Sequence, residues 1–368
     1  MKNRYFVLVI DGCAPEYLTP DTAPHIFRLA ETYGFIKTIK SAIPTVTNVN
    51  HACILSGRFP EDTGVTGNYY YNPDTGEEGF VEERGFMKIP TVLHTCRERG
   101  LKTAFLTVKG KVLGVYGEDA DIGINAQTPD LRQLESLGLA MPPGVSDPAC
   151  TEWIMSAALA CVRQEAPDFV YCTTNDCCFH HYGPETEEAR QQIQWIDYYI
   201  HEIHKADPHR QIYITADHGM NQKHRLLNVQ AIAQNHGIPL FCLAPLKDRY
   251  IDNHRYQEGG ILYLYLNNNS DRERLSALME SIPEIEMILP SEEAARRYHL
   301  PGDSIGDYVV FAAKDCAFGE IDGEYLETDS VRTHGSLWEQ EIPLAAVFPA
   351  MPEEFYHYSK DIAANLRL

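Results

Sequence analysis

The length, composition and charge of the chain narrow the classes of protein to which it can belong. Its 368 residues suffice for one large α/β domain with a smaller insertion, and 44% hydrophobic with 23% charged residues is typical of a globular protein. The formal charge is −21, from 31 Lys and Arg against 52 Asp and Glu. This charge argues against nucleic acid or an anionic membrane as a partner, because both attract a basic face. An anionic substrate therefore needs local cations, either metal ions or a few lysines.

The N-terminal segment and the cysteines predict a cytoplasmic protein. MKNRYFVLVID leads directly into an apolar strand and lacks the apolar region and cleavage site of a secretory signal. No apolar run approaches the roughly 18 residues that cross a bilayer. The 10 cysteines include no C-x-x-C pair. We therefore expect reduced cysteines in the cytoplasm and no membrane contact, with a homodimer as an alternative to a monomer.

Short apolar runs alternate with helical stretches along most of the chain. This alternation predicts an α/β fold with a doubly wound, mostly parallel sheet and helices on both faces. The expected core strands are Tyr5–Ile10, Phe35–Ile39, Thr103–Thr107, Phe169–Thr173, Ile212–Thr215 and Leu344–Phe348. The expected helices include Thr91–Arg99, Thr151–Gln164 and Glu185–His204.

The segment from about Ile261 to Phe311 has a different pattern. ILYLYLNN alternates like a strand, RERLSALMESI is an amphipathic helix, and DYVVFAA is a further strand. We interpret the segment as a smaller α+β insertion that covers the active site as a cap. The predicted division is a core of residues 1–245 and 325–368 with an inserted cap at residues 246–324.

Three of the predicted core strands are followed by an aspartate, at Asp11, Asp176 and Asp217. Ligands of open α/β sheets gather at the carboxyl ends of the strands, so the three carboxylates should converge on one sheet edge. So much negative charge in one place is unfavourable unless a cation neutralises it. The three positions therefore predict a bound cation.

Histidines accompany these carboxylates. His180 follows Asp176 by one helical turn, His218 follows Asp217 directly, and His334 precedes the last core strand in THGSL. Each match alone is common, because a strand-end Asp is often a turn former and a lone His is often structural. The ordered set favours a metal site, and carboxylates mixed with imidazoles suit Zn, Mn or Fe better than Ca or Mg.

The segment IPTVTNVNHACILSGRFP places Thr47 at the start of a helix expected over Asn48–Ser56. The N-terminus of a helix favours bound anions, and a metal ion would lower the pKa of the hydroxyl and make it a nucleophile. Thr47 as a simple N-cap is the alternative. The metal-type residues nearby favour the nucleophile.

Together these residues resemble the alkaline-phosphatase superfamily, in the branch of nucleotide pyrophosphatase/phosphodiesterases and phosphonoacetate hydrolases. PTVTNVNH resembles the nucleophile segment of that branch, and its second threonine is Thr47. The resemblance implies a doubly wound sheet with a cap, and two divalent metal ions, zinc first, with manganese or iron as alternatives. The ligands that it implies are Asp11, Thr47, Asp217 and His218 for one ion, and Asp176, His180 and His334 for the other.

Finer motifs are similar to those of phosphonoacetate hydrolase. They are TADHGMNQKH, RTHGSLWEQEIPL and FLTVKGKVLGVYG. The resemblance implies that Lys109 and Lys111 bind the substrate carboxylate, and that Asn68, in GVTGNYYY, donates to a phosphoryl oxygen. The alternative for the lysines is a solvated loop. One departure is Tyr182, which stands where phosphonoacetate hydrolases tend to carry another histidine and which is closer to the phosphodiesterases.

The expected function is hydrolysis of the C–P bond of phosphonoacetate, or a closely related carboxy-phosphonate, through a phospho-threonine at Thr47. The products are phosphate and acetate. The first alternative is a phosphodiesterase or nucleotide pyrophosphatase with the same metal site and an aromatic slot for a base. The second is a non-catalytic metal-binding relative, against which the intact nucleophile and ligand set argue. In each enzymatic case the partner is a small anionic phosphonate or phosphoester.

Overall fold

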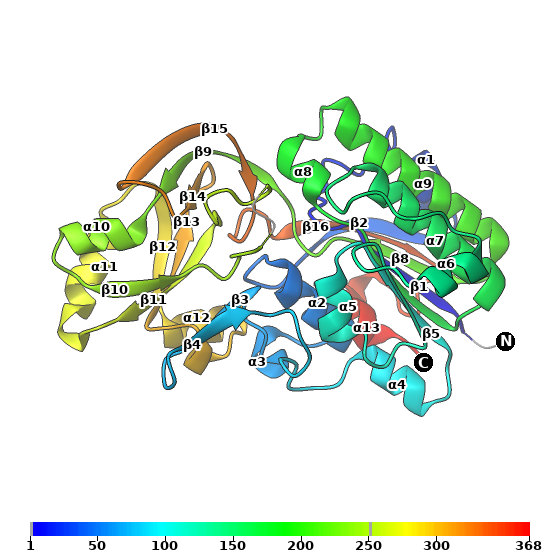
Figure 1. Ribbon diagram of the computed structural model, residues 1–368, viewed down its shortest axis with the longest axis horizontal. Helices are drawn as coiled ribbons and strands as arrows, with labels where there is room; N and C mark the ends of the chain where they lie inside the picture. Colours follow the sequence, from blue (N-terminus) through cyan, green and yellow to red (C-terminus); the bar gives the residue numbers. More distant parts are fainter. Residues whose placement is uncertain (1–2, 250–251) are drawn as a thin grey trace.

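A seven-stranded sheet lies at the centre of the larger part of the molecule (Figure 1), in the order β2-β16-β8-β1-β7-β5-β6. The computed structural model describes residues 3–249 and 252–368, so the first two residues of the N-terminal segment lie outside it. The strands β1, β5, β6, β7 and β8 pair in parallel, whereas β16 runs antiparallel to both of its neighbours. The prediction of a mostly parallel α/β sheet is therefore confirmed. The bounds are β1 Tyr5–Val9, β2 Gly34–Lys40, β5 Thr103–Thr107, β6 Ile122–Asn125, β7 Phe169–Thr173, β8 Gln211–Thr215 and β16 Glu341–Val347.

The strands at the centre of the sheet are buried on both faces, which explains why they consist of nearly continuous apolar residues. β1 lies between β7 and β8, and Val9 is level with Thr173 on one side and Thr215 on the other. This register brings the ends of the three strands to the same height. The residues that follow them are consequently neighbours in space.

Helices cover both faces of this sheet (Figure 1). The longest, α9, places Ile193, Ile196, Ile200 and Ile203 on one buried stripe, as the spacing of an amphipathic helix requires. Its first turn is capped by the side chain of Thr186. One face of the sheet is covered by α9 (Glu187–Ala206), α1 (Pro24–Tyr33) and α7 (Ala149–Glu165). The opposite face is covered by α2 (Thr47–Ser56), α4 (Val92–Glu98), α5 (Gly110–Tyr116) and α13 (Asp361–Asn365).

The predicted core elements all occur, and their ends differ from the predicted ones by at most three residues. The largest shift is in the last core strand, which begins at Glu341 rather than at Leu344 and ends at Val347. Phe348, predicted to be its last residue, has a φ of 53° and leaves the extended conformation there.

A second sheet, antiparallel and four-stranded, lies at the opposite end of the molecule (Figure 1), in the order β10-β11-β13-β12. The predicted strand, helix and strand of the insertion correspond to β11 (Ile261–Leu266), α11 (Arg272–Glu280) and β13 (Tyr308–Ala312). The division at residues 246–324 stays a prediction. Elements that we did not predict are β10 (Leu240–Leu243), β12 (Ile285–Pro290), α10 (Val229–Asn235) and α12 (Ser291–Tyr298).

A third sheet connects these two parts and positions a predicted ligand. β9 (Asn221–Leu227) pairs with β14 (Cys316–Phe318) and with β15 (Tyr325–Thr333). Thr333 is level with Asn221, so His334 emerges beside the segment that carries His218. The remaining described elements are α3 (Pro60–Thr63), α6 (Leu131–Leu137), α8 (Cys177–His181), the hairpin β3 (Tyr69–Asn72) and β4 (Glu77–Phe80), and 3-10 helices at Asn269–Asp271, Gly302–Ser304 and Glu353–Phe355.

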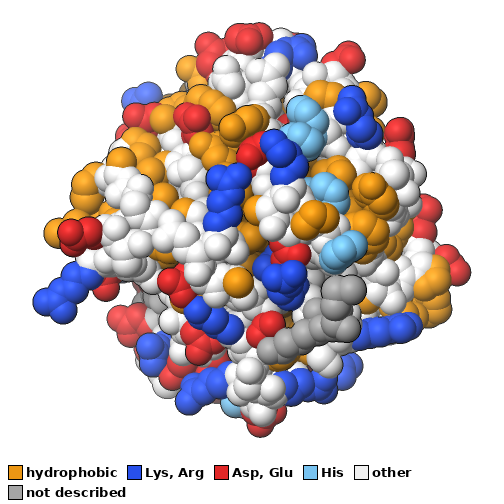
Figure 2. Space-filling view, turned by 90° about the vertical axis from the view of Figure 1, so that its right-hand side faces the viewer, with side chains coloured by type: hydrophobic (Ala, Val, Ile, Leu, Met, Phe, Trp, Pro, Cys, Tyr) orange, Lys and Arg blue, Asp and Glu red, His pale blue; other side chains and the backbone are white. Residues whose placement is uncertain are grey.

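The surface carries charges of both signs. On the face shown in Figure 2, Lys and Arg side chains are interspersed with Asp and Glu rather than gathered into one basic area. Within residues 3–249 and 252–368, no helix combines the length and the apolar character that crossing a bilayer requires.

Candidate active site

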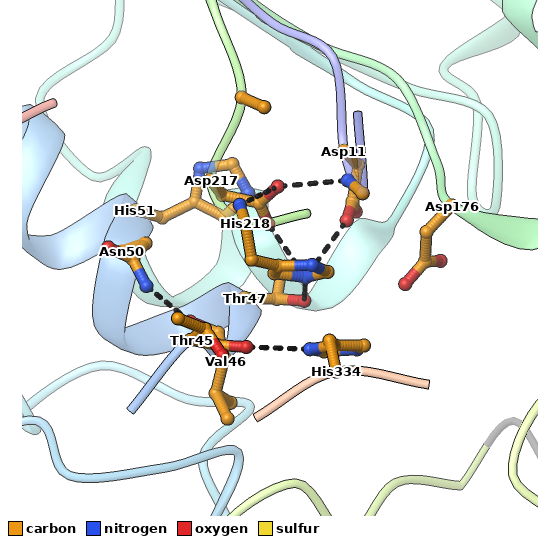
Figure 3. Close-up of polar contacts among 12 residues, drawn as sticks. Asp11, Thr45, Val46, Thr47, Asn50, His51, Asp176, Asp217, His218 and His334 are labelled. Carbon is orange, nitrogen blue, oxygen red and sulfur yellow. Dashed lines mark hydrogen bonds and ion pairs between the residues drawn. The ribbon is translucent and has the colours of Figure 1, made fainter. Parts of the chain in front are cut away.

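Three carboxylates meet at the carboxyl edge of the central sheet, as the sequence predicts (Figure 3). Asp11, Asp176 and Asp217 follow β1, β7 and β8, and each is at most 1% exposed. Asp217 Oδ1 accepts from the backbone N–H of Gly12 at 3.1 Å. Gly12 has a φ of 75°, and a Cβ there would lie 3.1 Å from the Cβ of Asp176. A glycine therefore permits the turn that brings the three carboxylates together.

The electrostatics of these carboxylates indicate a site built for a cation. Burial, reinforced by Asp176 and Asp217, raises the pKa of Asp11 to about 8. Burial raises the pKa of Asp217 to about 7. Asp176 is also buried, but Lys109 and His180 hold its pKa well below the usual range. Carboxylates that ionise this reluctantly are stabilised when a positive charge is bound between them.

The three predicted histidine ligands share one orientation. His180 Nδ1 lies 2.7 Å from the carbonyl oxygen of Arg332, His334 Nδ1 2.7 Å from that of Thr45, and His218 Nδ1 2.9 Å from that of Gly219. Each Nδ1–H therefore donates to a backbone carbonyl, which directs the lone pair of Nε2 toward the carboxylates. A carbonyl partner on the far nitrogen is the usual support of a metal-binding imidazole.

The side chains form two groups that fit metal ions. One group comprises Asp11, Asp217 and His218; the other comprises Asp176, His180, His254 and His334. Within each group the ligand atoms lie within 4.8 Å of one another, and every member is buried. His334 Nε2 and Asp217 Oδ2 are buried without a hydrogen-bond partner among the described residues. Buried atoms of this kind require a partner, and the mixture of nitrogen and oxygen donors suits a divalent transition metal.

Thr47 lies beside the Asp11 group, the group to which the resemblance assigns it. It is the first residue of α2 and 2% exposed, and its Oγ1 lies 3.4 Å from His218 Nε2 (Figure 3). The N-cap of the helix is Val46, so Thr47 is not a simple N-cap. Its hydroxyl instead points to the ligand atoms at the positive end of the helix.

The loop that carries His334 is tied to the segment before Thr47. Thr45 Oγ1 donates to the carbonyl of Ser336 at 2.8 Å and accepts from the N–H of Gly335 at 2.9 Å. Ser336 is held by Glu339, whose carboxylate accepts from its Oγ at 2.6 Å. Thr47 and His334 are thus fixed relative to each other by side chains that lie outside both metal groups.

Asn68 lies at the start of α2, the helix that Thr47 opens. It is 4% exposed, and its Oδ1 accepts from the backbone N–H of Asn48 at 3.1 Å. The amide nitrogen is therefore the end of the side chain that can donate to a ligand. This orientation suits the predicted contact with a phosphoryl oxygen, which stays a prediction.

Lys109 contacts both metal groups. Its Nζ lies 2.8 Å from Asp11 Oδ2 and 2.7 Å from Asp176 Oδ1, and the residue is 6% exposed. The lysine is therefore not in a solvated loop, which was the alternative for this residue. It supplies a positive charge where the ligand carboxylates crowd together.

Lys111 pairs with a carboxylate that the sequence did not single out. Its ammonium forms an ion pair with Asp248, and both side chains are nearly fully buried. Burial would raise the pKa of Asp248, but Lys111 and His254 hold it below the usual range. A substrate carboxylate bound by Lys111 therefore has to share this ammonium with Asp248.

The structure also places Tyr182, which departs from the family pattern, and His254, which the sequence did not single out. Tyr182, the residue that departs from the phosphonoacetate hydrolase pattern, is half-buried at the end of α8, and its carbonyl accepts from Tyr17 Oη at 2.9 Å. His254 belongs to the Asp176 group and was not predicted. It lies in an irregular segment where no strand end or motif marks it.

The mostly parallel sheet, the strand-end aspartates and the threonine at the head of α2 define a hydrolase of the alkaline-phosphatase superfamily. Residues 5–337 match the family model described as type I phosphodiesterase/nucleotide pyrophosphatase, and the chain belongs to this family.

Curated relatives show the same affiliation. The chain is 24% identical over 264 residues to an uncharacterised pyrophosphatase/phosphodiesterase of Schizosaccharomyces pombe. This match covers 65% of this chain and 51% of that protein. It is 25% identical over 230 residues to human ectonucleotide pyrophosphatase/phosphodiesterase family member 1, with 58% and 23% covered. The chain thus matches about half of the yeast protein and about a quarter of the human one.

Solved structures are similar over nearly the whole chain. Phosphonoacetate hydrolase of Sinorhizobium meliloti 1021, in complex with phosphonoacetate, has a TM-score of 0.88 and 27% identity, covering 98% of this chain and 94% of that chain. Murine ectonucleotide pyrophosphatase/phosphodiesterase 5 has a TM-score of 0.69 and 15% identity, covering 98% and 93%. The second likeness is one of fold alone.

Proposed function

We propose that the protein hydrolyses the C–P bond of phosphonoacetate, or of a closely related carboxy-phosphonate, to phosphate and acetate. The observation that carries the proposal is a pair of buried lysines. Lys109 lies beside the predicted ligands Asp11 and Asp176, and Lys111 is paired with Asp248. A dianionic phosphonate that also bears a carboxylate needs such cations in a protein of charge −21. The likeness to phosphonoacetate hydrolase over nearly the full length of both chains supports the same substrate class.

In the proposed mechanism, Thr47 Oγ1 gives its proton to water and attacks phosphorus. The Oγ–P bond forms and the P–C bond breaks, and the electron pair leaves with the carbon as the enolate of acetate, which takes a proton from water. Hydrolysis of the phospho-threonine then releases phosphate and restores Thr47. The α2 N-terminus and the Asn68 amide favour the developing phosphoryl charge. Two bound divalent ions, zinc first and manganese or iron as alternatives, would supply Lewis-acid stabilisation of the attacking and leaving sides.

The lysines have a defined task in this mechanism. An enolate departs only if the negative charge on its oxygens is matched by cations already in place. Carboxylates hold the ammonium groups of both Lys109 and Lys111, and the side chain of Lys111 is only 7% exposed. These groups therefore need little reorganisation when the substrate binds. They are therefore proposed to bind the carboxylate and to stabilise its enolate.

The alternative function is a phosphodiesterase or nucleotide pyrophosphatase, the activities after which the family model and the curated relatives are named. It requires an aromatic slot for a base beside Thr47. A cavity of about 430 Å³ is lined by Tyr69 and Phe241, but none of the predicted metal ligands lines it among the described residues. That cavity therefore provides no argument for a base slot at the nucleophile.

Phosphate or phosphoryl product release from four substrates tests the proposal. The metal-loaded protein is assayed with phosphonoacetate, a phosphomonoester, a phosphodiester and a nucleotide pyrophosphate. The proposal expects the highest kcat/KM for phosphonoacetate. A higher value for the diester or the pyrophosphate would assign the protein to the alternative function.

The cellular setting is the remaining part of the proposal. The 10 cysteines are free thiols, as expected for a cytoplasmic protein. A small anionic phosphonate is the proposed partner, with no nucleic acid or membrane. Measurement of the molecular mass in solution would distinguish a monomer from a homodimer.

A further inference from the structure

We infer that His254 is a fourth protein ligand of the Asp176 metal centre. The inference rests on the proposed function, because it concerns one of the two metal centres that this function uses. The resemblance to the family implied only Asp176, His180 and His334 for this ion. The geometry adds a third imidazole to them.

The position of the His254 ring carries the inference. The residue is 4% exposed, and its ring lies edge-on to that of His180, with 4.5 Å between centroids and an interplanar angle of 81°. The centroid of the His334 ring is 6.0 Å away. One ligand atom from each of the four side chains lies within 4.8 Å of all the others. Separations of this size fit donors arranged around one ion.

The hydrogen bonding of His254 also points to a missing partner. Its Nδ1 is buried and has no hydrogen-bond partner among the described residues. A buried imidazole in a structural role normally has such a partner, because a buried polar group without one is unfavourable. A metal ion between His254, His180 and Asp176 would satisfy this nitrogen.

The backbone around His254 holds the ring in place. Gln257 Oε1 accepts from the N–H of Asp248 at 2.7 Å, and Gln257 Nε2 donates to the carbonyl of Asp248 at 3.0 Å. The N–H of Gln257 donates to the carbonyl of His254 at 2.9 Å. Gln257 thus ties the segment that carries His254 to Asp248, which is itself paired with Lys111.

A fourth donor changes what the centre does. Catalytic zinc usually keeps three protein ligands and an open position. With four protein donors, an ion bound here in tetrahedral geometry would have no open position, and a phosphoryl oxygen would have to enter as a fifth ligand. The centre should therefore favour ions that accept five ligands.

Binding of Co²⁺ without substrate tests the inference. The visible spectrum of the protein loaded with two equivalents of Co²⁺ is compared between wild type, His254→Gln, His180→Gln and His181→Gln. His181 is exposed, adjoins His180 and belongs to neither metal group, so its variant should keep the wild-type spectrum. His254→Gln should change the band that His180→Gln changes and should weaken binding of that ion at least tenfold, since even an outer-shell partner is worth about 10- to 100-fold.

The outcomes separate the two proposals. A wild-type spectrum in His254→Gln, with both ions bound at unchanged affinity, overturns the assignment of His254. The same holds if only the KM for phosphonoacetate rises, because His254 would then contact the substrate rather than the ion. If the wild-type protein binds no metal and His180→Gln changes nothing, the proposed function itself fails.

Discussion

Replacement of Lys109 by methionine tests whether this lysine neutralises the carboxylates of the metal site. Methionine keeps the length and burial of the side chain but removes the charge. In the structure the ammonium lies 2.8 Å from Asp11 and 2.7 Å from Asp176. Without it, the metal-free protein retains three buried carboxylates with only imidazoles beside them.

The size of the effect follows from these contacts. At an effective dielectric constant of about 20, each contact is worth about 6 kcal/mol of attraction, part of which is offset by the desolvation of the ammonium. Removing one partner of a buried pair costs about 3–5 kcal/mol. We expect this loss in the free energy of unfolding of the metal-free variant. In the metal-loaded protein the ions neutralise the same oxygens, so the loss should be clearly smaller.

Urea unfolding with chelator and with excess zinc measures both losses. Their difference must appear as tighter metal binding by the Lys109→Met variant, by up to about 100- to 1,000-fold, because an ion that binds only the folded state stabilises it by its binding free energy. Lys111→Met is the matched control. Its partner Asp248 belongs to neither metal group, so it should destabilise both states equally.

Two results would refute this reasoning. Equal destabilisation of Lys109→Met with and without zinc would show that the lysine acts through packing. Weaker metal binding by the variant would show that the ammonium supports the ions rather than competing with them for Asp11 and Asp176.

Four further predictions concern the nucleophile, the metals, the lysine and pH. Thr47→Ala should abolish turnover while fold and metal content are retained, as circular dichroism and elemental analysis can check; near wild-type turnover would exclude Thr47 as nucleophile. Chelation should abolish activity, and Asp217→Asn should lower metal content and activity together; active protein without metal by elemental analysis would contradict this. Lys111→Met should lower kcat/KM for phosphonoacetate about ten- to a hundredfold, the worth of a charge-assisted hydrogen bond, but not for an aryl phosphonate ester; equal losses would place the lysine elsewhere. Burial raises the pKa of Asp11 to about 8 and of Asp217 to about 7, above their unfolded values of about 4. At these two carboxyls the folded metal-free protein binds more protons than the unfolded chain, but burial lowers the pKa of His51, His218, His254 and His334, which has the opposite effect below about pH 7. Stability should therefore fall as pH rises from about 7 to about 8, where the imidazoles are mostly neutral in both states; urea unfolding in chelator that shows a rise there would contradict this.

Most of the central sheet was predictable because its strands are buried on both faces. Such strands are continuous apolar runs, as in Phe169–Thr173, whose bounds agree with the structure. The strands β9 and β15 were not predictable, since NQKHRLL and YLETDSVRT carry exposed polar residues with no clear alternation. Their pairing is determined by contacts between distant segments. That β16 runs antiparallel to its neighbours could likewise not be predicted from its own sequence.

The residues of the candidate site likewise include some that could be predicted from the sequence and some that could not. Asp11, Asp176 and Asp217 were predictable because parallel strands bring their carboxyl ends to one edge. His254 was not, because it reaches the site from an irregular loop that only the tertiary structure brings there. The same is true of Asp248, whose pairing with Lys111 depends on the closure of that loop. Residues that act from loops leave no periodic signal in a single sequence.

The most direct test of the central claim is product analysis with phosphonoacetate as the only substrate. Phosphorus and proton NMR of the reaction with zinc-loaded protein should show phosphate and acetate appearing in equal amounts, at a rate proportional to protein. Thr47→Ala with the same metal content should form neither. Intact phosphonoacetate after prolonged incubation, under conditions where the same preparation cleaves a phosphodiester or a nucleotide pyrophosphate, would contradict the proposed function.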